Sequence, residues 1–250
     1  MKLIAAIAIL ILIVGIFIIA VHMRSAQRKK LLEGFDEKMT SISELPDSAM
    51  IPDYPEPFGY KSLWFAVKTT NKSRLAEIFG LVNSRDCNWT VGIQRAYEGG
   101  VFITPSIGDW TLICGYGLLI YDKNNRQKLL LNQLSAEFGS AQFFATHRVL
   151  DYHCWMKAER GKLIRCYQYS GEKGENLEVA GQETDIEKSL HLINTFSVEA
   201  KDSNYFERED ILTPDEETVM KIADNWSVDP STLNLRKDVA PGLGLFGVIK

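Results

Sequence analysis

Residues 142–169 read QFFATHRVLDYHCWMKAERGKLIRCYQY, and this stretch decides the fold. It contains three runs rich in aromatic and β-branched side chains, at 142–149, 152–158 and 163–169, which are typical of strands. Arg160 and Gly161 separate the second run from the third and are suited to the tight turn of a hairpin. We therefore predict three consecutive antiparallel strands.

Before and after these strands in the sequence, patterns typical of helices alternate with patterns typical of strands. Residues 126–138 place their leucines on one side and end before Gly139, which predicts a helix. Nearer the N-terminus we predict helices at 71–80 and 88–98, and strands at 62–69, 101–104 and 110–120. We predict that the segment 241–247, PGLGLFG, is an apolar tail that docks on the domain.

Two helix starts follow the strands. Thr184-Asp-Ile-Glu187 and Thr213-Pro-Asp-Glu216 both fit the capping box, in which side chains satisfy the first backbone N–H groups of a helix. After the second box, Val219, Ile222, Ala223 and Trp226 share one helical face. The predicted fold class is α+β: an antiparallel-rich sheet with helices packed on one face, preceded by a single N-terminal transmembrane helix.

The chain divides into three parts by composition. Residues 1–23 form a transmembrane anchor, and residues 24–60 form a basic juxtamembrane segment followed by a linker with four prolines. Proline-rich stretches act as semi-rigid spacers. We expect the globular α+β domain to occupy residues 61–250.

The predicted anchor is an unbroken apolar run at residues 3–21, which includes Leu3, Leu10, Val14, Phe17 and Val21. Nineteen residues of helix span roughly 28 Å, close to the hydrocarbon thickness of a bilayer. A cleaved secretory signal has a shorter apolar core and a small-x-small exit, whereas the exits here, at 18–20 and 24–26, place a large residue at one small position. We favour a retained single-pass signal-anchor; a cleaved signal and a buried soluble helix remain the alternatives.

Basic residues beside the run set its orientation. Arg24, Arg28, Lys29 and Lys30 follow it, against Lys2 and the terminal amine before it. Because basic flanks resist translocation, the large C-terminal part is expected on the cytoplasmic side. Outward translocation of the domain is the alternative.

The net charge disfavours nucleic acid as a partner. The whole chain carries −4, and residues 1–30 carry five basic and no acidic side chains, so the remainder carries −9. Such a body lacks the clustered Lys and Arg that phosphate backbones require. It suits a basic protein partner, and it equally suits a domain that simply stays dispersed in water.

The cysteines are four in number and scattered: Cys87, Cys114, Cys154 and Cys166. Three lie in predicted strands, where free cysteine is a common small apolar residue, and Cys87 is expected in a loop. We expect buried, reduced thiols rather than two disulfides.

The densest polar cluster lies within the hairpin stretch. His147, Asp151 and His153, with Cys154 beside them, contain the residue types of a nucleophile–base set or a zinc site. However, side chains alternate between the two faces of a strand, so His153 and Cys154 point in opposite directions. The spacing matches no metal signature, and the sequence predicts neither a metal nor a cofactor.

Part of the chain resembles an uncharacterised bacterial protein family. The resemblance rests on residues 144–155, 215–220 and 226–233, FATHRVLDYHCW, DEETVM and WSVDPSTL, and covers roughly residues 61–247. It implies a bacterial origin, and with the anchor an inner-membrane location. It implies no catalytic residue.

Three functions follow as hypotheses. The first is a non-catalytic protein-binding domain at the cytoplasmic membrane surface, for instance an immunity-type protein that neutralises a toxin by occlusion. The second is a membrane-tethered hydrolase using His147, Asp151 and His153. The third is a cell-envelope factor translocated outward.

Overall fold

The computed structural model describes residues 42, 44–121 and 126–249. Residues 45–250 form one compact unit, which contains every element discussed below. Within the described residues, no helix is both long and apolar enough to cross a bilayer. The predicted anchor and its basic flank lie outside the described residues, so both stay predictions.

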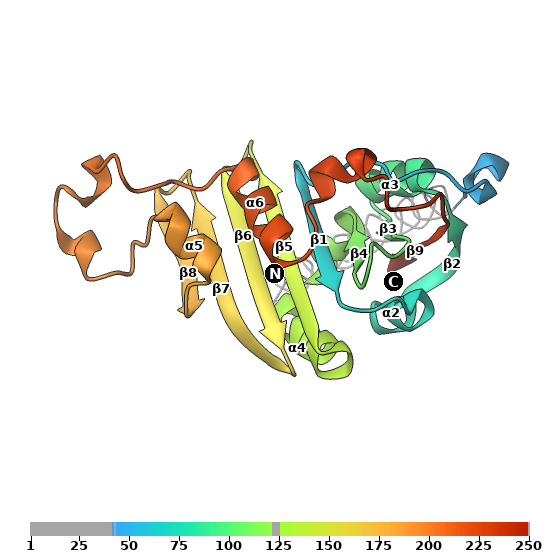
Figure 1. Cartoon of the computed structure of the whole chain (residues 1–250), viewed down its shortest axis with the longest axis horizontal. Coiled ribbons are helices and arrows are strands. Elements are labelled where there is room, and N and C mark those ends of the chain that lie inside the picture. The colour runs from blue at the N-terminus through green and yellow to red at the C-terminus, as the bar shows by residue number, and fades with distance from the viewer. Residues whose placement is uncertain (1–41, 43, 122–125, 250) are drawn as a thin grey trace, which may run out of the picture. The chain divides into compact units, whose positions relative to one another are not determined.

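This unit is built on a nine-stranded sheet in the order β2-β9-β3-β4-β1-β5-β6-β7-β8 (Figure 1). Every pair of neighbouring strands is antiparallel. The strands are β1 Ser62–Val67, β2 Leu81–Cys87, β3 Val101–Ile103, β4 Thr111–Cys114, β5 Ser140–His147, β6 Tyr152–Glu159, β7 Lys162–Ser170, β8 Glu175–Gly181 and β9 Gly244–Ile249.

Among the described residues, five α-helices lie between or after the strands: α2 Lys72–Ile78, α3 Trp89–Glu98, α4 Arg126–Phe138, α5 Asp185–Leu190 and α6 Glu216–Trp226. Short 3-10 turns complete the unit: η1 Asp47–Met50, η2 Tyr116–Tyr121, η4 Glu199–Lys201, η5 Tyr205–Glu207 and η6 Pro230–Leu235. The sheet and its helices together confirm the predicted α+β class.

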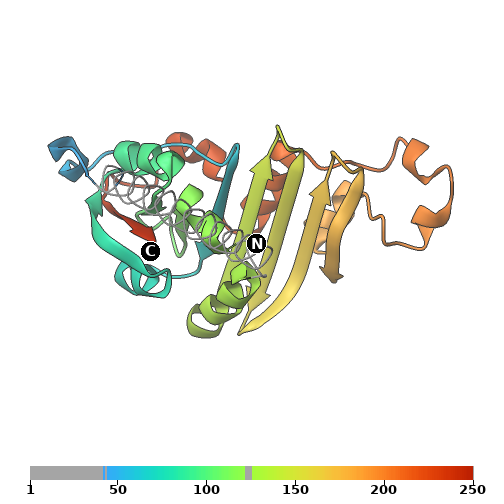
Figure 2. The same cartoon turned by 180° about the vertical axis from the view of Figure 1, so that it is seen from behind.

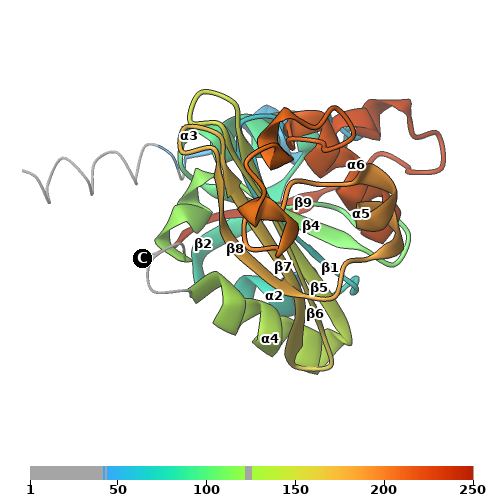
Figure 3. The same cartoon turned by 90° about the vertical axis from the view of Figure 1, so that its left-hand side faces the viewer.

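The helices cover both faces of the sheet, so the prediction of helices on one face is wrong. Leu130, Leu131 and Leu134 of α4 belong to the core cluster that contains Phe143 of β5. Trp226 of α6 instead packs on Phe144, with ring centroids 5.9 Å apart. Adjacent strand residues point to opposite faces, and Figures 2 and 3 show α4 on one side of the sheet with α5 and α6 on the other.

Aromatic side chains in register line the α5–α6 face. From β9 to β7, the residues directly opposite one another are six aromatic residues and one cysteine: Phe246, Phe102, Cys114, Trp64, Phe144, Trp155 and Tyr167. Trp64 stacks on Phe144 with centroids 5.1 Å apart, and Trp155 stacks on Tyr167 at 4.3 Å. We call this set the aromatic row; cross-strand pairs of this kind stabilise a sheet and fix its register.

Several predicted elements are confirmed with their bounds nearly unchanged. The helix predicted at 126–138 is α4, and the helices predicted at 71–80 and 88–98 are α2 and α3. The three strands of the quoted stretch are β5, β6 and β7. The strand predicted at 110–120 ends at Cys114, because Gly115 (φ 129°) leaves the extended conformation and Tyr116–Tyr121 form η2.

Strands β2, β8 and β9 are absent from the sequence expectations. β9 is the predicted apolar tail: it docks on the domain as expected, but as an inner strand between β2 and β3. Cys87, expected in a loop, ends β2 and is buried. The other three cysteines are also buried and none of the four forms a disulfide, and burial raises the pKa of the Cys87 thiol to about 12 and that of Cys166 to about 11. The expectation of buried thiols is thus confirmed.

The globular unit begins earlier than residue 61. Asp53 accepts hydrogen bonds from the backbone N–H groups of Trp89 (2.7 Å) and Thr90 (3.0 Å), which caps α3 from outside the helix. Asn88 donates its side-chain amide to the carbonyls of Ser48 and Ile51. Residues 45–60, expected to be linker, are therefore part of the compact unit.

The two predicted capping boxes have different outcomes. Thr184 and Glu187 form the box of α5 as predicted. The box of α6 consists instead of Asp215 and Thr218, so α6 begins at Glu216 and not at Pro214. The predicted buried face of α6 is confirmed, since its four residues pack inward.

Candidate functional site

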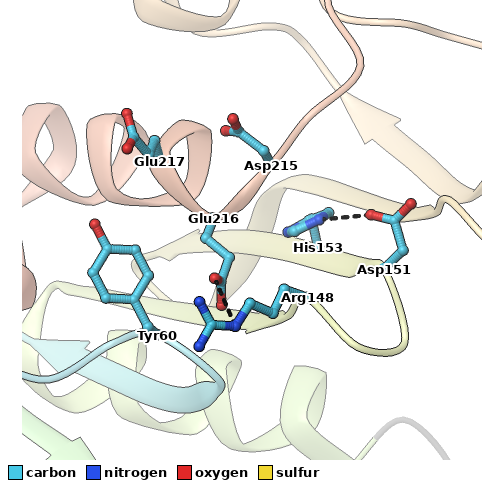
Figure 4. Close-up of a pocket in the computed structure, with 7 residues that line it drawn as sticks. All are labelled: Tyr60, Arg148, Asp151, His153, Asp215, Glu216 and Glu217. Carbon is cyan, nitrogen blue, oxygen red and sulfur yellow. Dashed lines mark hydrogen bonds and ion pairs between the residues drawn. The ribbon is translucent and has the colours of Figure 1, made fainter.

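A pocket of about 410 Å³ lies at the end of the sheet where β5 meets β6 (Figure 4). Three segments that are distant in sequence supply its walls: the residues before β1, the β5–β6 turn and the first turn of α6. The lining residues are Tyr60, Arg148, Asp151, His153, Asp215, Glu216 and Glu217.

The β5–β6 turn presents Asp151 in a left-handed conformation, with φ 44°. Aspartate tolerates this region better than most residues because its short side chain bonds locally. The Asp151 carbonyl accepts the Gly171 N–H at 2.7 Å. A Cβ on residue 171 would lie 1.6 Å from Asp151 Oδ2, so glycine at this position leaves room for the carboxylate.

His153 lies at the base of the pocket with 2% of its surface exposed. Its Nδ1 is 2.9 Å from Thr146 Oγ1, and its Nε2 is 3.1 Å from Asp151 Oδ1. Burial lowers the pKa of His153, although the hydrogen bond to Asp151 and the charges of Asp151, Asp215 and Glu216 oppose that effect. The neutral ring satisfies both contacts when the Thr146 hydroxyl donates to Nδ1 and Nε2–H donates to Asp151.

The first turn of α6 forms the opposite wall. Glu216 accepts the Lys61 N–H at 3.0 Å, and its other oxygen lies 3.9 Å from Arg148 Nε. Asp215 accepts the Thr218 N–H at 2.7 Å. Burial would raise the pKa of Asp215, but the Thr218 hydrogen bonds and nearby His153 outweigh burial and hold that pKa below its ordinary value.

The pocket is acidic. Four of its seven lining residues are carboxylates, facing one guanidinium and one buried imidazole. Asp215 and Glu217 are exposed at the rim, and Tyr60 presents a ring of which 43% is exposed. A cationic group that enters here meets carboxylates from two separate segments.

The predicted catalytic set is brought together only in part. Asp151 and His153 are in contact, but His147 lies on the other face of the sheet because Thr146 is the residue opposite His153 in register. His147 Nδ1 accepts the Leu150 N–H at 3.3 Å. Cys154 also points away from His153, as strand alternation predicted, and belongs to the core cluster on the α4 face.

The pocket contains carboxylates, an imidazole and a phenol but no aliphatic hydroxyl or thiol. None of its seven lining residues is a serine, threonine or cysteine. The Thr146 hydroxyl, beside His153, belongs to a residue with 1% of its surface exposed. In the part of the chain that the structure describes, no group of three or more His, Cys, Asp or Glu residues is placed to hold a metal ion.

Sequence reasoning identified the hairpin side of the pocket and missed the α6 side. The sequence places Asp215, Glu216 and Glu217 at a helix start and in one stretch of the family resemblance, and Tyr60 in a linker, and neither pattern indicates a pocket. The charge of that helix start is the signal that points to a site: three consecutive carboxylates exceed what one capping box requires.

Comparison with known proteins finds no match: no protein-family model, no curated protein and no solved structure is similar to the chain. The resemblance to a bacterial family thus stays a prediction.

Proposed function

We propose that this protein is a membrane-tethered, non-catalytic binding protein whose pocket takes a basic side chain of a protein partner. The observation that carries the proposal is the set of four carboxylates that line the pocket from two segments. A lysine or arginine side chain of the partner would find charge-assisted hydrogen bonds there, stronger than those between neutral groups.

The shape of the site supports an arginine in particular. Asp151 lies on the hairpin side, Asp215 and Glu217 on the helix side, and Tyr60 beside them (Figure 4). A planar guanidinium binds carboxylates in a bidentate manner and stacks flat on aromatic faces, whereas an ammonium interacts with both only as a point charge.

A binding role agrees better with the site than the alternative of a hydrolase. Both ring nitrogens of His153 have partners within the protein. His147 is on the far face, so the trio that a hydrolase would use is not assembled. The imidazole thus holds Asp151 in place.

The location completes the proposal. The apolar run at 3–21, followed by Arg24, Arg28, Lys29 and Lys30, would hold the domain at the cytoplasmic face of a bacterial inner membrane. A protein that occludes a basic toxin near the membrane, in the manner of an immunity protein, has this combination of anchor and acidic surface.

The test is charge reversal at the rim of the pocket. Full-length protein is purified from native membranes as wild type, Glu217→Lys and Asp109→Lys, and the bound partner is identified and quantified. Glu217→Lys should weaken binding about tenfold, equivalent to about 1.4 kcal/mol, because like charges then meet at the rim.

Asp109→Lys is the matched control. Asp109 is exposed in the turn between β3 and β4, at the opposite end of the sheet, and carries the same charge. Equal recovery of the partner by wild type and Glu217→Lys, or recovery of no protein at stoichiometric amounts, contradicts the proposal.

A further inference from the structure

Between α5 and α6 the chain leaves the sheet and projects beyond β8 (Figure 1). We call residues 191–213 the projecting segment. Its two ends are held together: Leu212 N–H donates to the His191 carbonyl at 2.9 Å, and Ile193 N–H donates to the Leu212 carbonyl at 3.0 Å. A surface loop whose ends are close and whose interior is ordered is frequently functional.

The segment is anchored and internally ordered. Tyr167, the last member of the aromatic row, donates its hydroxyl to the Ile193 carbonyl at 2.7 Å. Thr195 and Asn176 of β8 exchange two hydrogen bonds of 3.0 and 2.8 Å. Buried Tyr205 accepts the Asn194 N–H at 2.8 Å. The segment is therefore presented on a fixed base.

Three large apolar side chains of this segment are exposed to solvent. Phe196 is 63% exposed, Val198 is 80% exposed and Phe206 is 60% exposed. Covering a side chain of this kind removes apolar surface from water, which favours formation of a complex. Single exposed apolar residues are ordinary, but three within eleven positions of one ordered loop indicate an interface.

The charge around these side chains selects the occupant. Residues 199–210 contain five carboxylates and two basic side chains, a net −3. An anionic membrane surface would repel such a segment. A second copy of the chain would bring another body of charge −9 against it.

We propose that the projecting segment is the main docking surface for a basic protein partner, with Phe196 and Phe206 as its apolar anchors. The inference rests on the proposed binding function. It adds that contacts with the projecting segment supply most of the binding free energy. A pocket of about 320 Å³ between α5 and this segment, lined by Glu183, His191, Tyr205 and Arg208 among others, gives the partner's side chains a place beside the anchors.

The test begins with crosslinking in native membranes. A photoreactive phenylalanine analogue replaces Phe196 or Phe206 in the full-length protein, and Leu235, 71% exposed in η6, serves as the control position. Positions 196 and 206 should capture the same basic protein, and position 235 should not. Capture of lipid, of a second copy or of an acidic protein at 196 and 206 would overturn the proposal.

The captured protein is then purified and its affinity for the full-length chain measured. Phe196→Ser and Phe206→Ser should each raise the Kd at least tenfold, whereas Leu235→Ser should leave it unchanged. Because all three side chains are exposed, these substitutions leave the fold intact, which a thermal unfolding curve of each variant verifies.

The experiments distinguish failure of this inference from failure of the proposed function. If Glu217→Lys weakens binding while Phe196→Ser and Phe206→Ser do not, the pocket binds the partner and the projecting segment does not. If positions 196 and 206 capture no protein while Glu217→Lys still lowers recovery of the partner, only this inference is wrong; if wild type recovers no partner either, both proposals are wrong.

Discussion

At the scale of single residues, His153 is the most constrained polar group of the site. It is buried between a hydroxyl and a carboxylate, and burial lowers its pKa and thus favours the neutral ring. Protonation adds a hydrogen to Nδ1. The Thr146 hydroxyl then has to rotate and accept a hydrogen bond from Nδ1–H instead of donating one. The histidine therefore makes the stability of the domain depend on pH.

The direction of that dependence follows from the pKa values of the two states. The pKa of His153 is 6.5 in the unfolded chain and lower in the folded protein. Between these two values the unfolded state binds more protons, so the free energy of unfolding decreases as the pH falls below 6.5. Each unit of difference contributes about 1.4 kcal/mol.

Urea unfolding at pH 7.5, 6.5 and 5.5 measures this effect. His153→Asn should remove most of the pH dependence in that range, whatever its effect on absolute stability. His147→Asn, on the other face of the sheet, should keep the wild-type dependence. A pH dependence that is the same in His153→Asn and in wild type would show that another group is responsible.

At the scale of elements, α5 is held by a buried ion pair. The helix has six residues, too few to be stable alone, and its Glu187 carries almost no exposed surface. Glu187 Oε1 accepts from Arg165 Nε and from Trp155 Nε1, both at 2.7 Å. Its other oxygen accepts from the Thr184 N–H and hydroxyl. One side chain thus joins the helix cap to the aromatic row.

Glu187→Ala should lower the free energy of unfolding by about 3–5 kcal/mol, because it leaves the Arg165 guanidinium buried without a counter-ion. Urea unfolding with a single probe of the sheet measures the change. Glu183→Ala, two residues before the helix and exposed, should stay within about 0.5 kcal/mol of wild type.

The double variant Arg165→Met, Glu187→Leu distinguishes the ion pair from packing. It should recover much of the stability lost in Glu187→Ala, because apolar side chains of similar volume remove the desolvation cost of both charges. If the double variant is no more stable than Glu187→Ala, the ion pair of Arg165 and Glu187, with its hydrogen bonds, contributes more to the free energy of unfolding than we infer.

At the scale of the whole molecule, the prediction concerns membrane topology, that is, the side of the membrane on which the domain lies. With the basic residues 24–30 kept in the cytoplasm, the domain should resist added protease in spheroplasts and be degraded once the membrane is lysed. Replacing Arg24, Arg28, Lys29 and Lys30 by serine should expose the domain to protease in intact spheroplasts. Recovery of a soluble chain that begins near residue 21 or 27 would contradict the retained anchor.

The topology of the sheet explains which strands the sequence revealed. Every residue of β1 is buried, and its continuous apolar run, SLWFAV, is typical of a strand covered on both faces. Because a strand buried on both faces needs cover on both sides, this apolar run already argues against a sheet with helices on only one face. β2 is mostly exposed and carries a register shift between Val82 and Arg85, so no alternation marks it. β9, with two glycines, becomes a strand because β2 and β3 supply its hydrogen-bond partners.

The sequence by itself determined the local features: the bounds of α4, the three strands of residues 140–170, the cap of α5 and the contact between Asp151 and His153 across a short turn. Each depends on residues within a few positions of one another. Tertiary structure alone decided that Tyr60, Glu216 and Glu217 join that contact to form a pocket, and that His147 does not. Docking brings Tyr60 and the first turn of α6 to the hairpin from more than sixty residues away, and the β5–β6 register places His147 on the other face.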